Sequence, residues 1–269
     1  MTITTNDKTI NAAAAPNRSH SAVWRARAVR LHQWLAVLGG IALCVWGLSG
    51  ILHPIMTSFG PQQAVFSPPQ RALDLSPMIE VEKILARAGI VEAQAVKIIA
   101  GRDANLLQVT QRADDPRRYF RLEDGAELPE HDQAQAVWLA NYYMGFEQAA
   151  VRSVERITQF SDEYPSVNRL LPVYRIAFER DDDLAVYIYT ETNAVAAVTN
   201  AFKSDIQRWF QWLHTWSWLP REAEWARVLL ITLFVGSLSA LAATGVAMLF
   251  LVRRKKRAAG IRGWHRLAG

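Results

Sequence analysis

Two long runs of uncharged, mostly apolar residues constrain this chain more than any other feature. Residues 34–52 and 228–252 contain no Asp, Glu, Lys or Arg. A helix rises about 1.5 Å per residue and the hydrocarbon core of a bilayer is about 30 Å thick, so each run is long enough to span a membrane. A cleaved signal peptide has an apolar core of only about 7–15 residues and a small-residue cleavage site. The other alternative is a pair of buried core helices in a soluble protein.

Basic residues flank both apolar runs. The segment before the first run carries a net charge of +4, the segment between the runs −6, and the tail after the second run +7. Lys and Arg near membrane spans stay on the cytoplasmic side, so we predict that both termini are cytoplasmic and that the middle segment lies outside. The basic flanks then face anionic lipid, which makes the bilayer the predicted partner and argues against nucleic-acid binding.

The sequence predicts a membrane α-helical fold class, with two transmembrane helices plus an external α+β region. The predicted segments are a disordered cytoplasmic tail (1–24), the first transmembrane helix (25–56), a linker (57–73), two α+β modules (74–145 and 146–203), an aromatic interfacial segment (204–225), the second transmembrane helix (226–252) and a basic cytoplasmic tail (253–269). The tryptophans at 209, 212, 216, 218 and 225 define the interfacial segment, because indoles prefer the headgroup level.

The external segment has the pattern of a helix followed by strands, repeated twice. The first helix is predicted to begin at Ser76-Pro77 and end at Gly89, and a second ends at Gly145. Antiparallel strands are predicted at 95–100, 106–111, 118–122, 151–159, 173–179 and 185–190. The predicted core residues are Val81, Ile84, Leu85, Val137 and Trp138. One irregular mixed domain is the alternative to two modules.

A shared turn pattern supports the repeat. Tyr119 is followed by Glu123 and Gly125 at the same spacing at which Tyr187 is followed by Glu191 and Asn193. Gly and Asn are the residues that most readily adopt a positive φ. The sequence therefore predicts a strand and then a turn at both places.

Four of the six histidines lie at the borders of the apolar runs. His53 and His214 form a predicted outer pair, and His32 and His265 a predicted inner pair. Paired imidazoles near each leaflet are the ligand type of b-type haem, so all four are candidate cofactor ligands, with His53 and His214 as the candidate metal site. Interfacial histidines at the headgroups are the alternative, and the glycines of the apolar runs serve helix packing equally well.

Other chemistry is less well supported by the sequence. Cys44 is the single cysteine and lies in the first run, so the external segment has neither disulfides nor thiolate ligands, and no C-x-x-C-H motif attaches a c-type haem. The acidic stretch 179–183 is predicted to be a solvated hairpin turn rather than a cation site. His131-Asp132 is predicted to cap a helix. Hydrolase, zinc-protease and nucleotide fingerprints do not occur.

Several motifs resemble those of the PepSY-associated transmembrane proteins of the bacterial inner membrane. They are Arg30-Leu-His32-Gln-Trp34, Gly47-Leu-Ser-Gly50, Tyr164-Pro165-x-x-Asn168-Arg169-Leu170-Leu171-Pro172-Val173 and Trp209-x-x-Trp212-Leu213-His214. The resemblance covers about residues 28–255. It implies an inner-membrane location, a periplasmic region of PepSY-like modules and association with iron and siderophore uptake.

Two functions follow from the resemblance. Longer members are similar to haem-containing ferric-siderophore reductases, which implies a b-haem electron carrier or part of one. In those members a motif like Trp264-His265-Arg-Leu-Ala-Gly269 opens a third span, so we expect a haem carrier of this length to need a partner or a homodimer. The alternative is a non-enzymatic, membrane-anchored module that binds a peptide, a protease or an uptake partner.

Overall fold

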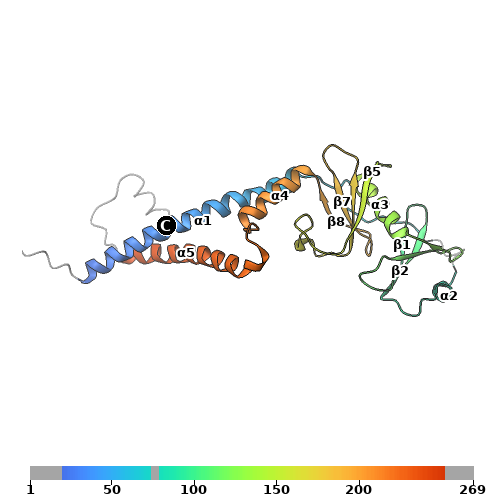
Figure 1. Ribbon diagram of the computed structural model, residues 1–269, viewed down its shortest axis with the longest axis horizontal. Coiled ribbons are helices and arrows are strands. Elements are labelled where there is room, and N and C mark those ends of the chain that lie inside the picture. The colour runs from blue at the N-terminus through green and yellow to red at the C-terminus, as the bar shows by residue number, and fades with distance from the viewer. Residues whose placement is uncertain (1–19, 74–78, 252–269) are drawn as a thin grey trace, which may run out of the picture. The chain divides into compact units, whose positions relative to one another are not determined.

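The computed structural model describes residues 20–73 and 79–251 of the chain (Figure 1). Contacts divide the chain into two compact units, a helical unit with residues up to Leu48 and from Trp216 onward, and an α+β unit of residues 49–215. The predicted basic tail after residue 252, most of the predicted N-terminal tail and the helix start at Ser76-Pro77 lie outside the described residues.

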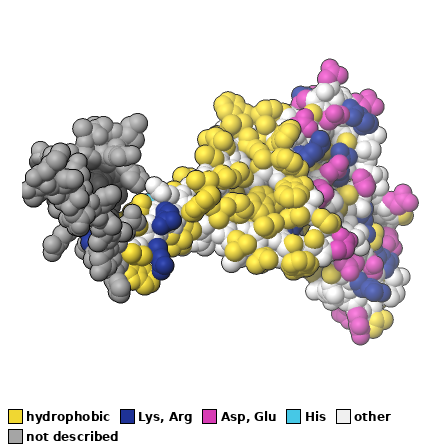
Figure 2. All heavy atoms as spheres, turned by 60° about the vertical axis from the view of Figure 1, so that its left-hand side comes forward, with side chains coloured by type: hydrophobic (Ala, Val, Ile, Leu, Met, Phe, Trp, Pro, Cys, Tyr) yellow, Lys and Arg dark blue, Asp and Glu magenta, His cyan; other side chains and the backbone are white. Residues whose placement is uncertain are grey.

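The helical unit pairs the two apolar helices, α1 (His20–Phe59) and α5 (Glu224–Leu251). His32 lies 2.9 Å from Thr244, measured from Nδ1 to Oγ1, and the ring of Trp46 meets that of Phe234 edge to face, so the helices run antiparallel. Only 17% and 6% of their most apolar stretches are buried, whereas a soluble protein's core helix is mostly buried. Figure 2 shows hydrophobic side chains over the helices, whereas the acidic side chains in view gather on the α+β unit. By length and composition, both helices could cross a membrane.

The α+β unit holds two four-stranded antiparallel sheets. The first has the order β1-β2-β3-β4, and the second β5-β6-β7-β8. The elements of the first half are α2 (Val81–Arg87), β1 (Ala95–Ala100), β2 (Asn105–Thr110), β3 (Arg118–Arg121) and β4 (Glu127–Leu128). Those of the second are α3 (His131–Met144), β5 (Val151–Ile157), η1 (Ser166–Asn168), β6 (Val173–Phe178), β7 (Ala185–Tyr189), β8 (Ala194–Thr199) and α4 (Ala201–His214), and η2 (Arg221–Ala223) precedes α5.

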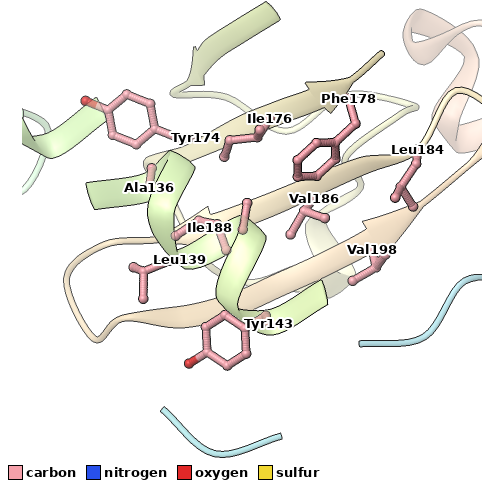
Figure 3. Close-up of a cluster of buried hydrophobic side chains, with 11 residues drawn as sticks. Ala136, Leu139, Tyr143, Tyr174, Ile176, Phe178, Leu184, Val186, Ile188 and Val198 are labelled. Atoms are coloured by element: carbon pink, nitrogen blue, oxygen red, sulfur yellow. The ribbon is translucent and has the colours of Figure 1, made fainter. Parts of the chain in front are cut away.

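Each sheet buries one face under a helix. Ile84 of α2 packs with Leu107, Val109 and Phe120 of the first sheet. Figure 3 shows α3 lying across β6, β7 and β8, with the labelled apolar side chains between helix and strands. Small residues at the contact allow α3 to approach the sheet closely, since Ala136 and Ala140 are both fully buried. These two clusters are the main cores of the unit.

The predicted α+β class and the antiparallel sheets are confirmed, and β1 has the predicted bounds 95–100. Strands β4 and β8 were not predicted. Of the five predicted core residues, Ile84 is fully buried and the other four are half-buried. On α3 the buried apolar face is instead formed by Ala136, Leu139, Ala140 and Tyr143. Helix α3, which the sequence assigns to the first module, packs on the second sheet.

The two predicted turns adopt the expected backbone. Gly125 has φ +72° and Asn193 has φ +53°, both in the left-handed region. The stretch 179–183 joins β6 to β7 as a hairpin, as predicted, and Asp183 there also has a positive φ. The positions predicted for these turns are therefore confirmed.

Candidate functional site

Both predicted outer histidines lie in the α+β unit. His53 is on the last part of α1, which belongs to this unit from residue 49 onward, and His214 is the last residue of α4. The ring of Phe210 is stacked on His214, with centroids 4.6 Å apart, and also contacts His53, with centroids 6.1 Å apart. His214 Nδ1 is hydrogen-bonded to Ser49 Oγ at 3.0 Å. Phe210 and His214 are four residues apart, so they share one face of α4, which is directed toward the end of α1.

The contacts of His53 and His214 include one that suits haem ligation and one that obstructs it. A hydroxyl on Nδ1 is the kind of contact that orients a metal-binding imidazole. Phe210, however, packs against both rings, so a porphyrin held by His53 and His214 would require this side chain to move. Of the inner pair, His32 contacts Thr244, and His265 lies outside the described residues. Haem ligation by these four residues stays a prediction.

A buried carboxylate joins the two sheets, and sequence analysis did not identify it. Asp132 is 2% exposed and accepts hydrogen bonds from the Tyr119 hydroxyl (2.8 Å), the Tyr174 hydroxyl (3.0 Å) and the Arg117 backbone N–H (3.1 Å). Burial, followed by the negative charge of Asp132, raises the pKa of both tyrosines. The predicted capping role is not observed, because Glu130 is the N-cap and makes no side-chain cap bond.

Glu191 forms a second link between the sheets. It follows β7 and accepts hydrogen bonds from Thr110 Oγ1 (2.6 Å) and Arg117 Nε (3.0 Å), and it forms an ion pair with Lys97. Burial alone would raise the pKa of Glu191, but the bonds from Lys97, Thr110 and Arg117 outweigh burial and lower it. Because all three donors precede α3, this carboxylate fixes the first half of the unit to the second.

A polar pocket of about 510 Å³ lies over the face of the second sheet that is turned away from α3. The face carries small residues at this point, including Ala177 and Thr199. One wall is the polar face of α4, on which Ser204, Gln207, Arg208 and Gln211 follow at helical spacing. The pocket is thus bounded by the sheet, α4 and the loop between β5 and β6.

The loop between β5 and β6 also covers the neighbouring part of that sheet face. Tyr164 is 1% exposed and stacks on Tyr187 with ring centroids 4.8 Å apart. The backbone oxygen of Asp162 accepts a hydrogen bond from Gln207 of α4 at 3.3 Å. This loop contains the Tyr164-to-Val173 motif of the resemblance, and its side chains form a small core with Val173 and Tyr187.

The charges of the pocket fall into two groups. Arg152 pairs with Asp183 at 2.7 Å, and Arg208 with Asp205 at 3.5 Å. Arg175, on β6, forms no ion pair in the described part of the chain, and its Nε is buried without a hydrogen-bond partner there. Burial raises the pKa of the adjacent Tyr187, and both the charge of the Arg175 guanidinium and its hydrogen bond with Tyr187 partly offset that rise.

One signal in the sequence could have drawn attention to Arg175. It is the single charged residue of the strand Val-Tyr-Arg-Ile-Ala-Phe, and its side chain alternates with those of Tyr174 and Ile176, which face α3. A charge on one face of an otherwise apolar strand marks that face as polar or ligand-facing.

No family model, no curated protein and no solved structure matches this chain. The resemblance to the PepSY-associated transmembrane proteins stays a prediction.

Proposed function

We propose that this chain is a two-span protein of the bacterial inner membrane that displays a pair of PepSY-like α+β modules in the periplasm and acts there as a binding module. The observation that carries the proposal is the polar pocket of about 510 Å³ on the second sheet, because its charged and hydrogen-bonding side chains converge on one concave site and could hold a polar ligand there. The resemblance implies that the module is associated with iron and siderophore uptake.

The membrane part of the proposal rests on length, apolarity and charge. Both helices meet the length and hydropathy needed to cross a bilayer. The net charges of +4, −6 and +7 along the chain match cytoplasmic termini and an external middle segment. Exposed Trp209 and Trp212 on α4, and Trp225 at the start of α5, have the amphipathic character expected near the outer headgroups.

The first prediction concerns this topology. A phosphatase reporter inserted in the β6–β7 hairpin at Asp182 is expected to be active, because it folds only in the periplasm. A fluorescent reporter fused after Gly269 is expected to be active, because it matures only in the cytoplasm. Exchanging the two reporters is the matched control, and both are then expected to be inactive. An active phosphatase after Gly269 would overturn the topology.

The second candidate function is the b-haem electron carrier, favoured by the Ser49 hydroxyl on His214 Nδ1. The absorption spectrum of the purified full chain separates the two candidates. For an anchored binding module we expect no Soret band. A Soret band that His214→Ala abolishes and Trp218→Ala retains would instead establish haem and replace the binding module as the proposed function.

A further inference from the structure

We propose that the pocket on the second sheet binds a small zwitterion of the amino-acid or short-peptide class, with its carboxylate on Arg175 and its ammonium group at Asp162 and Glu163. This inference deepens the proposed function by naming a ligand class for the same module.

Arg175 is the proposed partner of the ligand's carboxylate. A guanidinium presents five N–H donors, and planar carboxylates are its best-matched partners. Arg175 lines the pocket and forms no ion pair with another described residue, whereas Arg152 and Arg208 are paired with Asp183 and Asp205. Its guanidinium is therefore the lining cation best placed to pair with a ligand carboxylate. Glu155 lies opposite Arg175 in the strand register, but it is exposed and forms no described ion pair with it.

The loop between β5 and β6 supplies the proposed partners of the ligand's ammonium group. Asp162 and Glu163 line the pocket, and neither forms an ion pair with another described residue. The backbone oxygen of Asp162 is bound to Gln207 on α4, which places this loop segment beside the helix wall. Asp162, Glu163 and Arg175 all line the pocket and therefore offer both signs of charge to one ligand.

The remaining lining groups suit the polar middle of such a ligand. The lining carries more carboxylates than guanidinium groups, which disfavours a polyanion. The Thr199 and Ser204 hydroxyls are hydrogen-bonded to each other, and the Asn200 side-chain oxygen accepts from the Lys203 backbone N–H. Each hydroxyl or amide group can make further hydrogen bonds, as a polar ligand requires. A volume of about 510 Å³ lies within the ordinary range of small-molecule sites.

The test uses trialanine and the purified full chain in detergent micelles, with binding measured by calorimetry. We expect trialanine to bind, and we expect both trialanine amide and N-acetyl-trialanine to bind at least tenfold more weakly, because each lacks one terminal charge. Failure of trialanine to bind, or equal binding of the three peptides, would overturn the proposal. Binding of inorganic phosphate at the pocket in place of trialanine would show a plain anion site and would also overturn it.

Single substitutions test which pocket residue binds which charged end of the ligand. Arg175→Gln is expected to weaken trialanine binding at least tenfold. Binding of trialanine amide is expected to be unaffected, because this peptide has no carboxylate that could interact with Arg175. Glu163→Gln is expected to weaken trialanine and to leave N-acetyl-trialanine unaffected. Arg121→Gln, which removes a half-exposed arginine of the first sheet, is the matched control and should bind like the wild type. Unchanged binding by both pocket variants would contradict the assignment, whatever the reporters show about topology.

Discussion

Replacing Asp132 with alanine is expected to lower the free energy of unfolding of the α+β unit by about 3–5 kcal/mol. The substitution removes one carboxylate but leaves the Tyr119 hydroxyl, the Tyr174 hydroxyl and the Arg117 N–H without their acceptor. Each buried donor without a partner costs about 1–3 kcal/mol, and loss of a buried charged partner costs a similar total. Guanidinium unfolding followed by near-ultraviolet circular dichroism measures the change, because the buried tyrosines report tertiary packing.

Two further variants distinguish the effect of losing the hydrogen-bond acceptor from the effect of losing the negative charge. Asp132→Asn keeps an acceptor oxygen, and the tyrosine hydroxyls can rotate, so we expect its cost to be well below that of alanine. Asp103→Ala is the matched control, because this side chain is 91% exposed and surface substitutions change stability by about 0.5 kcal/mol or less. An Asp132→Ala protein as stable as the control would show that the carboxylate does not join the sheets.

The strands that sequence analysis found are those with strong local signals. Strands β6 and β7 are rich in β-branched and aromatic residues, which favour strands. Strand β8 is Ala-Val-Ala-Ala-Val-Thr, and alanine has little preference for strands, so its pairing with β7 depends on the sheet rather than on its own sequence. Strand β4 has two residues, too few to show any periodicity.

The side of α3 that packs on the sheet could not be predicted from the sequence either. Apolar residues occur all around this helix, so no single stripe indicates which side meets the sheet. The structure places Ala136 and Leu139 against the second sheet, while Val137 and Trp138 are half-buried beside it. The sequence thus predicted the helix and its end at Gly145, but not its orientation.

The residues that link the sheets could not be found from local patterns. Glu123 and Glu191 occupy equivalent positions in the two turns, yet Glu123 is exposed and Glu191 is bound by three side chains. The difference arises because the contact between the two halves is not symmetric. Asp132 likewise has the sequence context of a helix cap, and only the positions of Tyr119 and Tyr174 reveal its role.

The last prediction concerns Glu191. Glu191→Ala leaves the Arg117 guanidinium, whose side chain is 3% exposed, without a carboxylate partner. Removing one member of a buried ion pair costs about 3–5 kcal/mol, and we expect about 3 kcal/mol here because Lys97 is more exposed. Chemical unfolding at pH 7 measures the loss. Glu127→Ala breaks the more exposed pair with Arg118 and, as the matched control, is expected to cost less than about 1 kcal/mol.

The pH dependence gives this prediction a second readout. The folded pKa of Glu191 is lowered from 4.5, so its contribution is fully present above that value and is lost as the pH falls through the folded pKa. The stability difference between wild type and Glu191→Gln is therefore expected to be constant from pH 7 to about pH 5 and to shrink below pH 4.5. A difference that persists at low pH would show that Glu191 acts through packing alone. Loss of this carboxylate should also speed hydrogen exchange in β1 and β2, because Lys97 and Thr110 connect those strands to it.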